Sequence, residues 1–176
     1  MEMGHNSMKT RIYMDNAATT ALAGEVLERM LPYFSTLYGN PSSVHTEGRK
    51  ARRAVENARR EVAQAIGAEA GEIFFTSGGS ESDNWALRGT LSPLSGTEKN
   101  HIITSCVEHH ALLHTADALE KQGWQVTRLP VDAYGRIRMD DLRAALRPET
   151  ALISIMAANN EVGTLQPVRE IGLLAK

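Results

Sequence analysis

The sequence contains only one cysteine, Cys106, among its 176 residues. A single thiol excludes a disulfide within the chain, and it excludes a zinc or iron–sulfur site built from several of the chain's own cysteines. We therefore expect a reducing, cytoplasmic compartment. Cys106 follows a predicted buried strand at residues 101–105, so we interpret it as a structural thiol rather than a nucleophile.

Long apolar runs and a strong net charge are also missing. No run approaches the roughly 20 apolar residues that cross a bilayer, so we expect no membrane partner. The net charge of −2 argues against nucleic-acid binding, which needs a basic excess. Residues 1–10 lack the apolar core of a secretory signal, and we expect a disordered leader there. What remains, 42% hydrophobic and 23% charged, is typical of a soluble globular protein.

The periodicity of apolar residues predicts two helices in the first third of the chain. The clearer one covers residues 46–66, with alanines and valines on one side and mostly charged residues opposite, and Gly67 provides its C-terminal stop. The other covers residues 24–37, where we expect Pro32 to bend or break the helix. Residues 39–45 are rich in turn formers and predict a loop between them.

Strands and helices then alternate. Buried strands are predicted at residues 73–76, 101–105, 124–129 and 150–157, and each is followed by a helical pattern. This order predicts an α/β fold with a mostly parallel sheet flanked by helices.

The turn at residues 78–80 follows the first of these predicted strands. Gly78 and Gly79 leave no side chain to block a ligand, Ser80 adds a hydroxyl, and the N–H groups of the following helix favour an anion. That combination suits a phosphate. The alternative is an ordinary turn in which Ser80 caps the helix.

Two further polar clusters, at residues 108–110 and 159–161, follow predicted strands. Because ligands of open α/β sheets bind outside the carboxyl ends of the strands, these clusters and the glycine turn would offer an imidazole, an amide and a phosphate cradle around one crevice. A planar, phosphorylated, aromatic cofactor fits such a set. His110 and His114 lie one helical turn apart, but we favour an ordinary amphipathic helix and expect no metal.

Five motifs stand out along the chain, at residues 13–20, 39–45, 76–84, 108–109 and 159–163. In this order and spacing they resemble those of cysteine desulfurases of the NifS and IscS type, which are class V aminotransferases. The resemblance implies a fold-type I transferase that binds pyridoxal 5'-phosphate, incomplete in this chain, and a homodimer. Residues 11–45 would lie near the active site, and residues 46–176 would form the first part of the large cofactor-binding domain.

The same resemblance implies roles for four residues. Gly79 and Ser80 match the pair that holds the cofactor phosphate, although the family often has alanine and threonine there. His109 matches the catalytic imidazole that stacks on the pyridine ring and shuttles protons, and Asn160 matches the amide that binds the ring hydroxyl. Residues 16–20 match a segment near the amino-acid substrate.

The implied reaction converts L-cysteine to L-alanine and leaves an enzyme-bound persulfide for iron–sulfur cluster assembly, with a scaffold protein as a further partner. In the family, the lysine that bonds the cofactor and the nucleophilic cysteine lie beyond the last motif; neither Lys176 nor Cys106 matches them. We therefore expect the chain alone to be inactive and to pair as a homodimer or with a complementary fragment. Two alternatives remain: another class V enzyme such as a selenocysteine lyase, or a non-catalytic truncated paralogue that acts as a binding partner.

Overall fold

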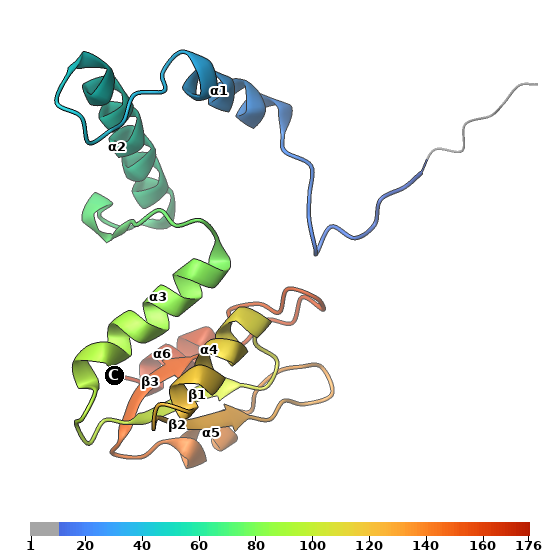
Figure 1. Cartoon of the computed structure of the whole chain (residues 1–176). Helices are drawn as coiled ribbons and strands as arrows, with labels where there is room; N and C mark the ends of the chain where they lie inside the picture. Colours follow the sequence, from blue (N-terminus) through green and yellow to red (C-terminus); the bar gives the residue numbers. More distant parts are fainter. Residues whose placement is uncertain (1–10) are drawn as a thin grey trace, which may run out of the picture. The chain divides into compact units, whose positions relative to one another are not determined.

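The computed structural model describes residues 11–176, which fall into two compact units that meet between Phe74 and Phe75 (Figure 1). The leader predicted for residues 1–10 lies outside the described residues. Within the described part, no helix combines the length and the apolarity needed to cross a membrane.

The first unit contains two helices and a short 3-10 helix. Helix α1 spans Gly24–Ser35, α2 spans Thr46–Ile66, and η1 spans Ala70–Glu72. The bounds of α2 match the prediction, and Gly67 ends it in the left-handed conformation with φ of 70°. Of the two effects expected of Pro32, a bend or a break, the break does not occur, because α1 continues to Ser35. The apolar side chains of α1, including Phe34 at 71% exposed, are not buried.

The loop between α1 and α2 packs closely against the start of α2. A Cβ added to Gly39 would collide with the backbone carbonyl of Glu47, and one added to Gly48 would collide with that of Ser43. Arg52 fixes the same loop from the helix side by donating to the carbonyl of Pro41 at 2.8 Å. These backbone approaches require glycine at both positions.

The second unit is a three-stranded parallel sheet with helices on both faces, as predicted. Its elements run α3 Gly79–Leu91, η2 Ser92–Leu94, β1 His101–Ser105, α4 His110–Glu120, β2 Gln125–Leu129, α5 Met139–Ala145, β3 Thr150–Ser154 and α6 Val168–Leu174. The strand order is β2-β1-β3, so β1 is central and all five of its residues are buried. Strand β3, predicted to reach Ala157, ends at Ser154, because the ladder stops at the pair Thr104–Ser154.

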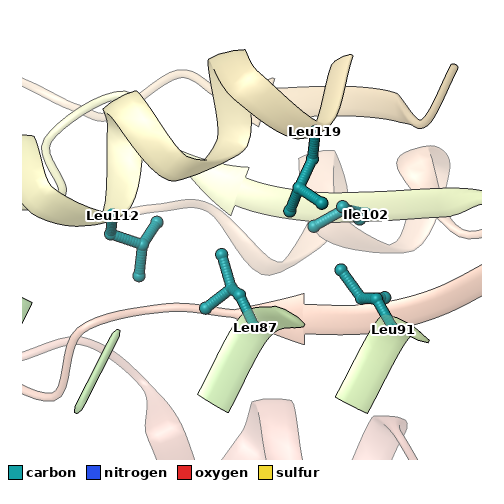
Figure 2. Close-up of a cluster of buried hydrophobic side chains, with 5 residues drawn as sticks. All are labelled: Leu87, Leu91, Ile102, Leu112 and Leu119. Atoms are coloured by element: carbon teal, nitrogen blue, oxygen red, sulfur yellow. The ribbon is translucent and has the colours of Figure 1, made fainter. Parts of the chain in front are cut away.

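Alternate residues of β1 build the two halves of the core. Figure 2 shows Ile102 in one cluster with Leu87 and Leu91 of α3 and with Leu112 and Leu119 of α4. The neighbouring residue Ile103 points to the opposite face, where it packs with Leu142 of α5 and Ile171 of α6. The sheet is therefore covered by α3 and α4 on one face and by α5 and α6 on the other.

One predicted strand does not form. Residues 73–76 are not part of the sheet, and Phe74 and Phe75 are 63% and 51% exposed. Their aromatic and apolar character favours a strand, but the sheet of the described residues is built from β1, β2 and β3 only. Helix α3 therefore begins after an irregular segment rather than after a strand.

Candidate functional site

The turn that opens α3 is held by side-chain hydrogen bonds on both sides of its glycines. The hydroxyl of Thr76 lies 2.7 Å from that of Ser82 and 3.2 Å from the carbonyl oxygen of Gly78. The backbone N–H and the hydroxyl of Ser77 both donate to one oxygen of Glu81, at 2.6 and 2.7 Å. These bonds cross from the segment before the helix to its first turn, so they fix the direction in which α3 starts.

The same turn leaves donors available to a ligand. Gly78 is the N-cap residue and provides no side-chain cap, so the alternative in which Ser80 caps the helix is wrong. A Cβ at Gly78 or Gly79 would meet no atom within 4 Å. Within residues 11–176, the N–H groups of Gly79 and Ser80 have no hydrogen-bond acceptor, as expected for a first helical turn. This donor set fits a phosphate group.

A carboxylate lies beside these donors. The hydrogen bonds from the hydroxyl and the backbone of Ser77 lower the pKa of Glu81, so this side chain is ionised at neutral pH. Its oxygen is satisfied by Ser77 and not by the N–H groups of Gly79 and Ser80. The carboxylate therefore orders the turn without using the donors that face a ligand.

His109 occupies the N-cap position of α4. Its Nδ1 accepts the backbone N–H of Ala111 at 3.1 Å, and the side chain is exposed. Because Nδ1 is an acceptor, the neutral ring carries its proton on Nε2. The backbone thus selects one tautomer, and Nε2 makes no hydrogen bond to any described residue.

The other histidines of this helix form no metal centre. The rings of His110 and His114 stack with centroids 5.7 Å apart, and both residues are exposed. Among the residues that the structure describes, no group of three or more His, Cys, Asp or Glu side chains is arranged to hold a metal ion.

Asn160 lies in the loop that follows β3. Backbone hydrogen bonds close this loop, from Asn159 to Thr164 at 2.9 Å and from Gly163 back to Asn159 at 3.0 Å, and Gly163 has φ of 76°. The side chain of Asn160 is exposed and makes no hydrogen bond to any other described residue. Its amide is therefore available to a ligand.

Two residues without a role in the sequence interpretation connect these elements. Glu108 is only 7% exposed and accepts the backbone N–H of Met156, just beyond β3. Asn159 donates from Nδ2 to the carbonyl of Val107, just beyond β1, at 3.2 Å. The sequence signal for Glu108 was a carboxylate directly after a buried strand, which needs a partner in the interior.

Helix α3 also lies near the residues that follow β1 and β3. Asp83, on its second turn, is close enough to Glu108 for its charge to raise the pKa of that buried carboxyl, although burial itself is the larger cause. In Figure 1 the start of α3, the start of α4 and the loop after β3 lie at one end of the second unit. The three predicted clusters therefore gather at the carboxyl edge of the sheet, two from strand ends and one from a helix N-terminus.

Cys106 lies at this edge as well, directly after β1. The residue is exposed, although it follows a buried strand, and its interpretation as a structural thiol stays a prediction. The strand ends at Ser105, and Cys106 is connected to β2 only through its backbone N–H, which donates to the carbonyl of Leu129 at 3.0 Å. Its side chain is left outside the core.

Comparisons with known proteins agree with this geometry. The cysteine desulfurase IscS of Methanosarcina thermophila is 54% identical over 165 residues, which are 94% of this chain and 41% of the relative. A solved structure described as a NifS-like protein is 42% identical, with a TM-score of 0.92 over 95% of this chain and 46% of that one. A structure of SspA in complex with cysteine is 44% identical, with a TM-score of 0.85 over 90% of this chain and 46% of that one.

The chain spans less than half the length of these relatives. The match extends over nearly all of the described residues, because the aminotransferase class-V family model covers residues 12–176. The likeness therefore includes the glycine turn, the imidazole at the start of α4 and the loop after β3. By this match and by its cysteine desulfurase relatives, the chain belongs to the aminotransferase class-V family.

Proposed function

We propose that this chain forms the phosphate-binding and ring-binding part of a cysteine desulfurase that uses pyridoxal 5'-phosphate. One observation carries the proposal: a helix N-terminus with available N–H donors, an imidazole of defined tautomer and an unpaired amide gather at the carboxyl edge of one parallel sheet. Membership in the class V family supports the choice of cofactor.

In this proposal the phosphate lies at the start of α3. The N–H groups of Gly79 and Ser80 and the hydroxyl of Ser80 donate to its oxygens, and the partial positive charge of the helix N-terminus stabilises the anion. Glu81 keeps the turn in shape through Ser77. The three donors come from adjacent residues, so they bind the group without a cationic side chain.

His109 and Asn160 would hold the aromatic ring. The imidazole of His109 would stack on it, and Nε2 would be the atom that exchanges protons with the bound amino acid, since Nδ1 accepts the N–H of Ala111. The amide of Asn160 would donate to the ring hydroxyl. When bound, the cofactor supplies the electron-withdrawing ring that stabilises charge at the amino acid's α-carbon.

The overall reaction belongs to the full-length protein. The C–S bond of L-cysteine breaks, a new S–S bond forms on an enzyme thiol, and the hydrogens of that thiol and of cysteine are shared between L-alanine and the persulfide. The lysine and the nucleophilic thiol of the family match no residue of this chain. Residues 11–45 would contribute contacts near the substrate, and residues 46–176 would belong to the large cofactor-binding domain.

The proposal extends to the surroundings of the enzyme. A homodimer or a complementary polypeptide would complete the site, an iron–sulfur scaffold protein would accept the sulfur, and the cytoplasm would supply the reducing conditions that a persulfide carrier needs. Pull-down of the full-length protein with and without cysteine tests the acceptor, and the molar mass in solution tests the pairing.

The central experiment follows the cofactor and the products. The 176-residue chain is titrated with pyridoxal phosphate, and the full-length protein is assayed for alanine and sulfide from L-cysteine. We expect Ser80→Ala to weaken cofactor binding, and His109→Gln to reduce turnover far more than the matched exposed variant His114→Gln. Turnover of selenocysteine but not cysteine would assign a different class V enzyme. Turnover of cysteine by the 176-residue chain alone would refute the proposal that the catalytic lysine and the nucleophilic thiol lie outside this chain.

A further inference from the structure

The turn after β1 and the loop after β3 are joined by two side chains that cross in opposite directions. Glu108 reaches from the turn to the end of β3, where Oε1 and Oε2 accept the N–H of Met156 at 2.9 and 3.1 Å. Asn159 reaches from the loop to the turn, where Nδ2 donates to the carbonyl of Val107 at 3.2 Å. Neither bond belongs to the sheet ladder, which ends at Ser154.

Each crossing residue is itself held in place. The hydroxyl of Ser105 donates to Oε1 of Glu108 at 2.7 Å, so the carboxylate accepts two donors. The Oδ1 of Asn159 accepts the backbone N–H groups of Glu161 and Val162, both at 3.0 Å, which orders the loop around Asn160. Rotation of either side chain would break bonds to both its own segment and the opposite one.

Each crossing residue also immediately precedes a candidate ligand-binding residue: Glu108 precedes His109, and Asn159 precedes Asn160. We propose that Glu108 and Asn159 are positioning residues that hold the imidazole of His109 and the amide of Asn160 at a fixed separation across the edge of the sheet. That His109 and Asn160 bind an aromatic ring rests on the proposed function. The hydrogen bonds of Glu108 and Asn159 are independent of it.

The chemistry of Glu108 explains why a carboxylate is used. The N–H of Met156 and the hydroxyl of Ser105 are both donors, and a carboxylate offers acceptors only. Bonds to an ionised acceptor are about twice as strong as neutral ones, so they offset part of the cost of burying the charge. Alanine would leave both donors without an acceptor, so the turn and the loop could separate and carry His109 away from Asn160.

The first test needs no ligand. In the 176-residue chain labelled with ¹⁵N, the ring nitrogens of His109 report the tautomer, and hydrogen exchange reports the order of the Asn160 loop. We expect a predominant Nε2–H tautomer that becomes a mixture in Glu108→Ala and in Asn159→Ala, with faster exchange at Glu161 and Val162. Glu108→Gln, which keeps one acceptor oxygen, should restore the tautomer. Folded variants with an unchanged tautomer and unchanged exchange would overturn the proposal.

The second test distinguishes binding of the aromatic ring from binding of the phosphate group. We expect Glu108→Ala to weaken binding of pyridoxal phosphate by about tenfold and binding of inorganic phosphate by less than about twofold. In a background with both His109→Ala and Asn160→Ala, the same change should cost less than about twofold, because nothing remains to be positioned. The exposed variant Glu98→Ala is the control.

Equal losses for both ligands, or a tenfold loss that persists in the double-alanine background, would show that Glu108 only supports the fold and would overturn the proposal. If the unaltered chain binds pyridoxal phosphate no better than inorganic phosphate, the proposed function fails, and the tautomer measurement still decides on the positioning role.

Discussion

Both carboxylate oxygens of Glu108 accept the backbone N–H of Met156, which lies 48 residues further along the chain. The bond begins where the ladder of β1 and β3 ends, and so it extends the connection between these strands beyond their last paired residues. The buried side chain of Glu108 thus connects the two segments where a longer strand would otherwise do so, and the backbone after β3 remains free to form the loop.

The first prediction concerns the pH dependence that Glu108 introduces. Burial, with a smaller contribution from Asp83, raises the pKa of this carboxyl above its usual value of 4.5. Between 4.5 and the raised pKa the native state binds more protons than the unfolded state, so stability falls as pH rises through this window. Glu108→Gln should lack this fall.

Urea unfolding of the 176-residue chain from pH 4 to pH 8 measures this fall in stability. The free energy of unfolding of the unaltered chain minus that of Glu108→Gln should decrease with rising pH and then level off. An increase with pH would mean that the pKa is lowered rather than raised. Glu98→Gln, at an exposed site, serves as the control.

The second prediction concerns His101, which is fully buried in the central strand. Its two ring nitrogens lie 2.9 Å from the hydroxyl of Thr150 and 2.8 Å from that of Thr127, so it connects β1 to both neighbours. Burial, and then the charge of Arg147, lowers the pKa of this imidazole below 6.5, while Glu149 opposes the shift. The unfolded state therefore binds the proton more readily, and stability should fall as pH drops below about 6.5.

In thermal unfolding between pH 7.5 and pH 5, His101→Gln should show a smaller drop in melting temperature on acidification than the unaltered chain. The exposed His114→Gln should keep the original slope. If the drop in melting temperature disappears in His114→Gln and persists in His101→Gln, the loss of stability in acid comes from His114, and the prediction for His101 is wrong.

The third prediction concerns Thr104, whose buried hydroxyl has no hydrogen-bond partner among the described residues. Valine has nearly the same shape and no polar atom to desolvate, so Thr104→Val should be neutral or stabilise the fold by up to about 1 kcal/mol. Thr115 is the matched control, since it is buried and its hydroxyl donates to the carbonyl of Ala111 at 2.8 Å. Thr115→Val should cost about 1 kcal/mol. Chemical denaturation checks both, and a larger cost at Thr104 would contradict the prediction.

The fourth prediction concerns Gly48 at the start of α2. Helix propensity alone would make alanine better than glycine here by about 1 kcal/mol. The added Cβ would instead meet the backbone carbonyls of Ser43 and Asn40, so we expect Gly48→Ala to destabilise the chain by about 1–3 kcal/mol. Gly172→Ala in α6, where a Cβ meets nothing within 4 Å, should be stabilising. Circular dichroism during urea unfolding compares the two.

The sequence predicted best where a signal is local. The capping glycine and the long amphipathic period defined α2 to the residue, and the predicted buried strand at 101–105 has the bounds of β1. The sequence predicted worst where the structure of a segment depends on partners far away in the chain. Residues 73–76 have the composition of a strand yet lie outside the sheet, and β3 is shorter than its apolar run because its ladder with β1 stops at the pair Thr104–Ser154.

The candidate site follows the same division. His109 and Asn160 could be chosen from polar clusters after predicted strands, and the structure puts these clusters at one edge. Their roles toward a cofactor remain predictions. Glu108 and Asn159 received no role, because their partners lie 48 and 52 residues away in the chain, and no local pattern shows which backbone group a side chain will meet.

The strand order β2-β1-β3 has a consequence for how the protein is made. His101 pairs with Gln125 on one side and with Thr150 on the other, so the central strand leaves the ribosome before either of its neighbours. Ile103 ends up fully buried against Leu142 of α5 and Ile171 of α6, so its side chain must wait uncovered in the growing polypeptide until both of these later helices have been synthesised. One of the most buried side chains of the finished molecule is thus exposed in the nascent chain until α6, the last element that covers it, has been made.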